Sequence, residues 1–209
     1  MLITPGSHVL FYGDSITDAG RNREDVNSLG GGYPYLIASA LLARFPEWNL
    51  RITNKGISGN RVFDLENRLE ADVIALKPTV VSILIGINDT WRRYDSNVVS
   101  EIKEFQASYE RIINRLTEEL QARIVICEPF LLPVPEDRKT WREDLDPRIT
   151  SIRELAWKYN LPYLPLDGLF AAAATEVQAS YWLPDGVHPS LAGHGFIAEK
   201  WLDLAVKRR

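Results

Sequence analysis

Short apolar runs rich in β-branched residues alternate along this chain with longer segments that carry apolar residues at helical spacing. The strongest signal is Val80–Ile85, which Pro78 and Gly86 bound. Strands that alternate with helices form a parallel sheet covered on both faces, with right-handed crossovers. The pattern therefore predicts an α/β fold with five strands, at Val9–Tyr12, Leu50–Asn54, Val80–Ile85, Arg123–Cys127 and Tyr163–Leu166.

Helical segments are expected between and after these strands. They lie at Leu36–Phe45, Val62–Leu76, Val98–Leu120, Leu145–Tyr159 and Leu191–Val206. We find no internal repeat, no low-complexity segment and no linker long enough to divide the chain. A chain of 209 residues suits one sizeable core, so we expect a single domain over residues 1–209.

The composition is that of an ordinary globular protein, with 45% hydrophobic and 25% charged residues and a formal net charge of -4. Nucleic acids and anionic membranes select basic faces, so we expect neither as a partner. The first residues lack the basic and apolar regions of a signal peptide, and no apolar run approaches the roughly 20 residues of a membrane span. We therefore expect a cytoplasmic protein. The single cysteine, Cys127, allows no internal disulfide and is expected to be a buried strand thiol.

Polar motifs follow three of the expected strands, and a fourth precedes the last expected helix. They are GDS at 13–15, GISGN at 56–60, GIND at 86–89 and DGVHP at 185–189. In an open parallel sheet, ligands bind outside the carboxyl ends of the strands. We therefore expect the first three motifs to converge on one edge of the sheet.

The residue types in these motifs are those that serine-based acyl transfer requires: a nucleophile, a base, a group that orients the base, and donors for the oxyanion. Asp185 and His188 are three residues apart, so the carboxylate can reach one ring nitrogen. The other nitrogen can then take a proton from Ser15. The candidate oxyanion donors are the backbone N–H groups of Ser15 and Gly59 and the side-chain amide of Asn88.

In order, spacing and local context, the four motifs resemble the blocks of the SGNH (GDSL) hydrolase superfamily, over residues 13 to 189. The resemblance implies a three-layer α/β/α, flavodoxin-like fold with sheet order 2-1-3-4-5. It also implies a serine esterase that uses no cofactor. In that resemblance Ser15 is the nucleophile, His188 the base and Asp185 the orienting acid, and Ser15, Gly59 and Asn88 are the oxyanion donors.

Longer runs around the motifs resemble a narrower group. They are GDSITDAGR, NKGISGNRVFDL, SILIGINDTWRRYD and LPDGVHPSLAGH. They are similar to those of bacterial acetylxylan and xylo-oligosaccharide acetylesterases. This resemblance implies a cytoplasmic homo-oligomer that removes acetyl groups from imported sugar fragments.

Several residues beside the motifs are candidates for substrate binding: Asp14, Trp91, Arg92, Tyr94 and Trp182. Aromatic rings can stack on sugar faces and wall off a small acyl pocket, although ordinary packing or a subunit contact would explain the rings equally well. Arginines in the same loops would ring the mouth of the site, or would simply be solvated: Arg21, Arg61, Arg92 and Arg93. The triglycine at 30–32 lacks the remainder of a phosphate-binding loop, and we expect a flexible loop near the entrance.

Some of the same residues also have a simpler structural interpretation. Ser15 alone would be a helix cap, and Asp89 is expected to bond neighbouring loop backbone. Asp185, His188 and His194 would suggest a metal site, but zinc needs further converging ligands, so we expect no metal. We expect His194 to be structural and His8 to lie at the surface.

The leading hypothesis is therefore an esterase that removes acetyl groups from carbohydrate hydroxyls. One alternative keeps the chemistry with a lipid, aryl or thioester substrate. Another is a carbohydrate-binding protein without catalysis. The nucleophile elbow of α/β-hydrolases is not present, because the GDSIT and GISGN runs both lack the second glycine of that motif.

Overall fold

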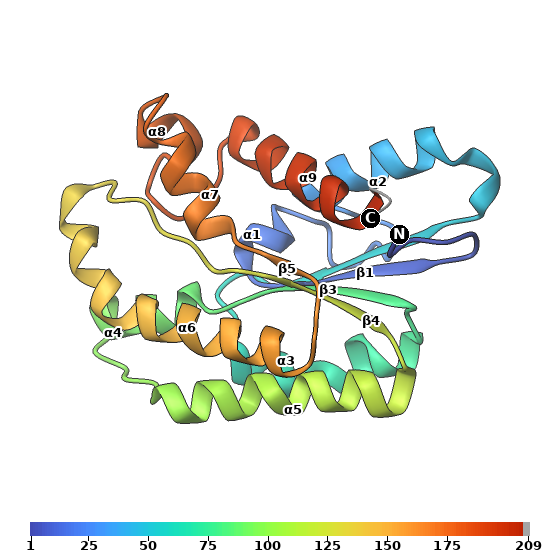
Figure 1. The fold of residues 1–209 in the computed structure, drawn as a ribbon, viewed down its shortest axis with the longest axis horizontal. Coiled ribbons are helices and arrows are strands. Elements are labelled where there is room, and N and C mark those ends of the chain that lie inside the picture. The colour runs from blue at the N-terminus through green and yellow to red at the C-terminus, as the bar shows by residue number, and fades with distance from the viewer. Residues whose placement is uncertain (207–209) are drawn as a thin grey trace.

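A sheet of five parallel strands forms the middle of three layers in the computed structural model, which describes residues 1–206 (Figure 1). The strand order is β2-β1-β3-β4-β5, as the resemblance implies. This confirms the flavodoxin-like α/β/α fold. The strands are β1 His8–Gly13, β2 Arg51–Gly56, β3 Val80–Leu84, β4 Arg123–Cys127 and β5 Tyr163–Leu164.

Helices cover both faces of the sheet (Figure 1). On one face lie α1 Ser15–Asp18, α2 Tyr33–Arg44, α7 Leu166–Ala173, α8 Ala179–Trp182 and α9 Leu191–Val206. The other face carries α3 Val62–Asp72, α5 Ile102–Leu120 and α6 Arg142–Lys158, with α4 Ile87–Asp95 near the carboxyl ends of the strands. Short 3-10 turns occur at η1 Pro46–Trp48, η2 Ile74–Leu76 and η3 Glu136–Trp141. No helix within residues 1–206 is long and apolar enough to cross a bilayer.

Both faces of the sheet are apolar, which explains why the strands read as continuous hydrophobic runs. Successive residues of a strand point to opposite faces. Val9 and Phe11 accordingly join the core beneath α2 and α9, and Leu10 and Tyr12 join the core beneath α3 and α5.

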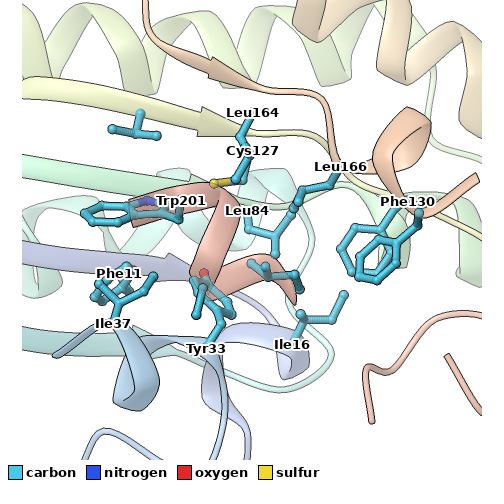
Figure 2. Packing of buried hydrophobic residues seen from close by; sticks show 14 of the residues in the cluster. Phe11, Ile16, Tyr33, Ile37, Leu84, Cys127, Phe130, Leu164, Leu166 and Trp201 are labelled. Atoms are coloured by element: carbon cyan, nitrogen blue, oxygen red, sulfur yellow. The ribbon is translucent and has the colours of Figure 1, made fainter. Parts of the chain in front are cut away.

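Aromatic rings fill the first of these cores where α2 and α9 pack together (Figure 2). The ring of Phe11 lies 5.6 Å from that of Tyr33 and 5.5 Å from that of Trp201, centroid to centroid. The indole N–H of Trp201 donates to the Ser82 hydroxyl at 3.0 Å, so its one polar atom is satisfied in the core. Cys127 is fully buried beside Ser82, which confirms the expected strand thiol.

Four helices differ in their bounds from the sequence expectation. α2 spans Tyr33–Arg44 instead of Leu36–Phe45, and α3 ends at Asp72, with η2 as a separate turn. β5 ends at Leu164, because Leu166 begins α7.

The helix expected at Val98–Leu120 begins at Ile102, and a separate helix, α4, precedes it. Asn97 adopts the left-handed backbone conformation between them, with φ of 53°, which ends the first helix. The helix expected at Leu145–Tyr159 begins earlier, at Arg142, and continues through Pro147.

His8 is not at the surface, contrary to expectation. β1 lies between β2 and β3, so its first residue is covered, and His8 is only 7% exposed. The His8 Nε2 atom lies 2.9 Å from Thr53 Oγ1 on the neighbouring strand. Burial, together with the charge of Arg51, lowers the pKa of His8.

Two of the three glycines at 30–32 are closely packed. A Cβ on Gly30 would lie 2.3 Å from the carbonyl oxygen of Asp18, and one on Gly32 would lie 2.9 Å from the ring of His194. Gly32 also precedes the first residue of α2. These glycines allow α2 to approach α1 and α9 closely.

Candidate active site

The four polar motifs meet at the carboxyl edge of the sheet. β1 leads into Ser15, β2 leads into the turn that holds Gly59, and β3 leads into Asn88 at the start of α4. The segment before α9 brings Asp185 and His188 to the same place, because the His188 ring lies within hydrogen-bonding distance of Ser15. The expected convergence is therefore observed.

A continuous chain of hydrogen bonds joins Ser15, His188 and Asp185. Ser15 Oγ lies 3.0 Å from His188 Nε2, and His188 Nδ1 lies 2.7 Å from Asp185 Oδ2. The second carboxylate oxygen of Asp185 accepts the backbone N–H groups of Val187 at 3.0 Å and His188 at 2.7 Å. The carboxylate therefore favours a proton on Nδ1, which leaves Nε2 to accept the proton of the Ser15 hydroxyl.

The charges of His188 and Asp185 favour a role for His188 as a base that becomes positively charged during the reaction. The hydrogen bond to Asp185 raises the pKa of His188, and burial opposes the shift only in part. Burial alone would raise the pKa of Asp185, but the hydrogen bonds from His188 and Val187 outweigh it and hold that pKa well below its usual value. Asp185 is thus ionised at neutral pH and stabilises the imidazolium form of His188.

The three candidate oxyanion donors lie in the segments that follow β1, β2 and β3 at the carboxyl edge of the sheet. Ser15 is the first residue of α1, where backbone N–H groups have no partner within the helix. The N–H of Asn60 donates to the Ile57 carbonyl at 3.2 Å, and Gly59 has a φ of 83°, as the third position of a type II turn requires. That turn uses neither hydrogen-bonding group of Gly59. The Asn88 amide donates to the Asn60 carbonyl at 3.1 Å and has a second N–H to offer.

An open cavity of about 520 Å³ lies in front of the nucleophile. Its lining residues come from α1, from the loop after α1 and from the Gly59 turn: Ser15, Asp18, Gly20, Arg21, Asn22, Arg23 and Ser58. The motif analysis did not single out Asp18, although it lies three residues after the nucleophile. Its carboxylate accepts the backbone N–H of Ser58 at 3.1 Å and that of Arg21 at 3.1 Å, so it ties the two walls together.

Asp14 lies beneath the nucleophile and not at the mouth of the cavity. It is fully buried, and one carboxylate oxygen accepts the backbone N–H of Ile16 at 3.0 Å. The other oxygen has no hydrogen-bond partner among residues 1–206. Burial raises the pKa of Asp14 to about 7. The structure therefore places this side chain where it supports Ser15 and out of reach of a substrate.

Trp91 is the candidate aromatic residue that contacts the catalytic groups. Its ring lies 5.7 Å from that of His188 and 5.2 Å from that of Trp141. Tyr94 stacks on Trp141 at 5.3 Å and donates its hydroxyl to the Thr140 carbonyl at 2.7 Å. Tyr94 is therefore connected to Trp91 through Trp141.

Trp182 packs among α7, α8 and α9, and His188 lies in the segment between α8 and α9. The Trp182 ring lies 5.3 Å from that of Phe196, and its indole N–H donates to the Ala173 carbonyl at 3.3 Å. Its own carbonyl accepts the N–H of Ser190 at 2.9 Å. These contacts hold α8 against α9 and fix the loop between them.

The four arginines of the motif loops point in different directions. Arg21 lines the cavity, and its Nε–H donates to the Gly56 carbonyl at 2.8 Å. Arg92 pairs with Asp95, and its Nη2 lies 3.7 Å from the position of a Cβ on Gly59. The other two are engaged elsewhere: Arg61 lies over the ring of Phe63, and Arg93 pairs with Asp144.

Two polar residues near the site have structural partners. The Asp89 carboxylate accepts the backbone N–H of Val62 at 3.2 Å, which confirms the expected bond to neighbouring backbone and caps α3. His194 Nδ1 accepts the backbone N–H of Tyr33 at 3.2 Å. Within residues 1–206, no group of three or more His, Cys, Asp and Glu side chains is arranged to hold a metal ion.

Comparisons with known proteins agree with this geometry. Residues 11–196 match the GDSL-like lipase/acylhydrolase family. The chain is 37% identical over 209 residues to an acetylxylan esterase from Geobacillus stearothermophilus, covering 97% of this chain and 95% of that protein. A crystal structure of an acetylxylan esterase from the same organism superposes with a TM-score of 0.91 at 34% identity, covering 100% and 98% of the two chains.

Another solved structure, named as a GDSL-like lipase from Parabacteroides merdae, superposes with a TM-score of 0.92 at 34% identity, covering 97% of each chain. The chain therefore belongs to the GDSL-like lipase/acylhydrolase family. It is a carboxylic ester hydrolase with the SGNH hydrolase fold.

Proposed function

We propose that this ester hydrolase removes acetyl groups from the hydroxyls of small carbohydrates, such as acetylated xylo-oligosaccharides. The proposed roles are Ser15 as nucleophile, His188 as base and Asp185 as orienting acid. The observation that carries the mechanism is the hydrogen-bond chain from Ser15 Oγ through both ring nitrogens of His188 to Asp185, at 3.0 and 2.7 Å. The carbohydrate substrate rests on similarity to the acetylxylan esterases.

The reaction follows from this geometry in two halves. Ser15 Oγ attacks the ester carbonyl carbon while His188 Nε2 takes the hydroxyl proton. The negative charge on the carbonyl oxygen is met by the N–H groups of Ser15, Gly59 and Asn88. When the tetrahedral intermediate collapses, the ester C–O bond breaks and Nε2 gives its proton to the departing sugar oxygen. The acetyl group remains on Ser15.

Water completes the cycle. His188 takes a proton from a water molecule, and the resulting hydroxide attacks the acetyl carbonyl. The bond between the acetyl carbon and Ser15 Oγ then breaks, His188 returns the proton to Oγ, and acetic acid leaves and ionises to acetate. Each step uses the same oxyanion donors and the same pair of ring nitrogens, and no step needs a metal or a cofactor.

Two residues of α4 beside the catalytic groups support a sugar substrate. Trp91 is a candidate for stacking against a sugar ring, because it lies beside His188, where the leaving alcohol must receive its proton. Arg92 reaches toward the Gly59 turn from the same helix. We propose Trp91 and Arg92 as substrate contacts, with Tyr94 and Trp182 acting through the residues on which they pack.

We propose further that residues 1–209 act as one domain of a cytoplasmic homo-oligomer, in keeping with the resemblance to the xylo-oligosaccharide acetylesterases. One observation favours assembly: Trp157, on the outer surface of α6, is 87% exposed. Exposed aromatic residues are typical of subunit contacts. Sedimentation of the wild type and of Trp157→Glu tests the contact, and cell fractionation tests the location.

Comparison with Ser15→Ala tests the enzyme mechanism. The wild type is expected to hydrolyse 4-nitrophenyl acetate and acetylated xylo-oligosaccharides, and Ser15→Ala to show only the background rate. Equal rates would overturn the proposed mechanism. Rates on acetyl, butyryl and octanoyl esters test the acyl group. A preference for octanoyl esters would favour a lipid acylhydrolase over the carbohydrate acetylesterase.

A further inference from the structure

Arg68 lies outside all four polar motifs and makes hydrogen bonds to three separate segments behind the active site. It belongs to α3, and its side chain is 15% exposed. Its Nη2–H donates to the Gly13 carbonyl at 3.1 Å and its Nη1–H to the Lys55 carbonyl at 2.9 Å. Its Nε–H donates to Asn60 Oδ1 at 2.7 Å. One guanidinium group thus joins the ends of β1 and β2 and the turn that follows β2.

Each of these contacts lies close to an oxyanion donor. Gly13 is two residues before Ser15, and Asn60 directly follows Gly59. The carbonyl of Asn60 also accepts the amide N–H of Asn88 at 3.1 Å. All three donors are therefore linked to Arg68, either through the adjoining backbone or through Asn60.

The guanidinium group is itself held in one orientation. It lies over the ring of Tyr12, with Cζ 4.4 Å from the ring centroid. Its Nη1 lies 2.6 Å from Asp72 Oδ2, and the other Asp72 oxygen lies 3.1 Å from Lys55 Nζ. The Tyr12 ring thus covers the flat face of the guanidinium group, and Asp72 occupies one side of its edge. The Nε–H and Nη2–H groups donate to the loops of the active site. A lysine ammonium has three donors on a flexible stem and cannot reproduce this planar fork.

We propose that Arg68 is a positioning residue that sets the relative placement of the three oxyanion donors. An oxyanion hole stabilises the transition state because its donors are already in place when the charge develops. Donors from three loops keep that arrangement only if the loops are fixed to one another. Arg68 connects two of the loops directly and the third through Asn60. This inference rests on the proposed oxyanion roles of Ser15, Gly59 and Asn88.

Arg68→Gln and Arg68→Lys test the proposal. A misplacement of about 1 Å costs on the order of 10²-fold in rate, so we expect kcat to fall by about 10- to 100-fold with KM nearly unchanged. A boronic acid that forms a tetrahedral adduct with Ser15 is expected to lose affinity by the same factor as kcat. A ground-state ligand such as free xylobiose is expected to bind as before. For Arg68→Ala, added methylguanidinium is expected to restore part of kcat.

Two control variants separate positioning from stability. Arg115→Gln removes an arginine of the exposed face of α5, which pairs with Glu70 and Glu119, and is expected to leave kcat unchanged. Asp72→Asn removes the ion pair of Arg68 but keeps its bonds to Gly13, Lys55 and Asn60. It is expected to lower the thermal unfolding temperature and to change kcat far less than Arg68→Gln does.

The experiments distinguish a failure of the positioning role from a failure of the proposed catalytic function. If Ser15→Ala and Asn88→Ala lose activity while Arg68→Gln keeps wild-type kcat, the positioning role is wrong and the proposed mechanism stands. If kcat of the Arg68 variants falls only in step with thermal stability, with boronic acid affinity unchanged and no rescue by methylguanidinium, Arg68 is purely structural and the inference is overturned. If Ser15→Ala stays active, the proposed function itself fails.

Discussion

His194 accepts a hydrogen bond from the backbone N–H of Tyr33, with 3.2 Å between Nδ1 and N. This bond joins α9 to the first turn of α2, where an N–H group has no partner within its own helix. The acceptor nitrogen must be unprotonated. Burial, together with the nearby His188, lowers the pKa of His194 to about 4, so the ring is neutral wherever the enzyme would act.

The two histidines next to the site are therefore expected to respond differently to substitution. His188→Ala removes the base and is expected to lower kcat by about 10⁴–10⁶-fold. His194→Ala leaves the Tyr33 N–H unpaired, so it is expected to cost about 1–3 kcal/mol of stability while most of the activity remains. Steady-state kinetics and thermal unfolding of both variants check this. The reverse pattern would assign the base to His194.

Asp185→Asn is expected to lower kcat by about 10⁴-fold, because an amide no longer favours the tautomer with a proton on Nδ1. The pH profile should also move. In the wild type, kcat/KM rises with pH as His188 loses its proton, at a pH above that of an ordinary histidine because Asp185 raises the pKa. Without that carboxylate, the rise in residual activity is expected at lower pH. An unchanged midpoint would contradict the coupling of Asp185 to His188.

Gly59→Ala is expected to lower activity through backbone strain and not through crowding. Gly59 has a φ of 83°, and the atom nearest to a new Cβ would be Arg92 Nη2 at 3.7 Å. A left-handed conformation costs an alanine about 1–2 kcal/mol, and relaxation of the turn would redirect the Gly59 N–H. We expect kcat to fall by about tenfold or more.

A matched control for this substitution is Gly6→Ala. Gly6 has a φ of 77° with no atom within 4 Å of a new Cβ, and it lies before β1, at the opposite end of the sheet. It is expected to cost similar stability and to leave kcat unchanged. Equal loss of kcat in the two variants would show that Gly59 does not contribute through its N–H.

Asp14→Asn is expected to change how stability depends on pH. The carboxyl of Asp14 has a folded-state pKa of about 7 against an ordinary value of 3.8. Between these values the folded chain keeps a proton that the unfolded chain releases, so this stabilising contribution is complete below about pH 4 and is lost as the pH rises to about 7. The asparagine does not titrate.

The measurement is the thermal unfolding temperature of both proteins across this pH window. As the pH rises, the wild type should lose several degrees relative to Asp14→Asn. Asp89, whose pKa burial also raises to about 7, is present in both proteins and cancels in the difference. Parallel curves would contradict the burial of an unpaired Asp14 carboxyl.

The elements that the sequence predicts best are those whose apolar pattern is dictated by the core. β4 has the bounds expected from the run at Arg123–Cys127, and α9 begins at Leu191 as the helical spacing predicts. α4 escaped prediction because it is only nine residues long, although Ile87, Trp91 and Tyr94 recur along it at helical spacing. Its buried first turn contains Asn88 and Asp89, whose burial follows from contacts with the loops after β2.

The residues of the candidate site likewise fall into those that the sequence predicts and those that it does not. Ser15, Asp185 and His188 could be found because their chemistry limits them to short motifs. Arg68 could not, because its partners are carbonyl and amide oxygens of segments that only the fold brings together, and any residue type can supply a carbonyl. His8 shows the same limit, since the strand order decides whether the first residue of β1 is covered.

Ser15 and its hydrogen-bond partner His188 are 173 residues apart in the chain. At a translation rate of about 5–20 residues per second, the serine leaves the ribosome roughly 10–35 seconds before the histidine. Throughout that interval the nascent chain carries a hydroxyl with no base, so it is chemically inert toward esters. The order of synthesis thus keeps the serine inactive until His188 has been made.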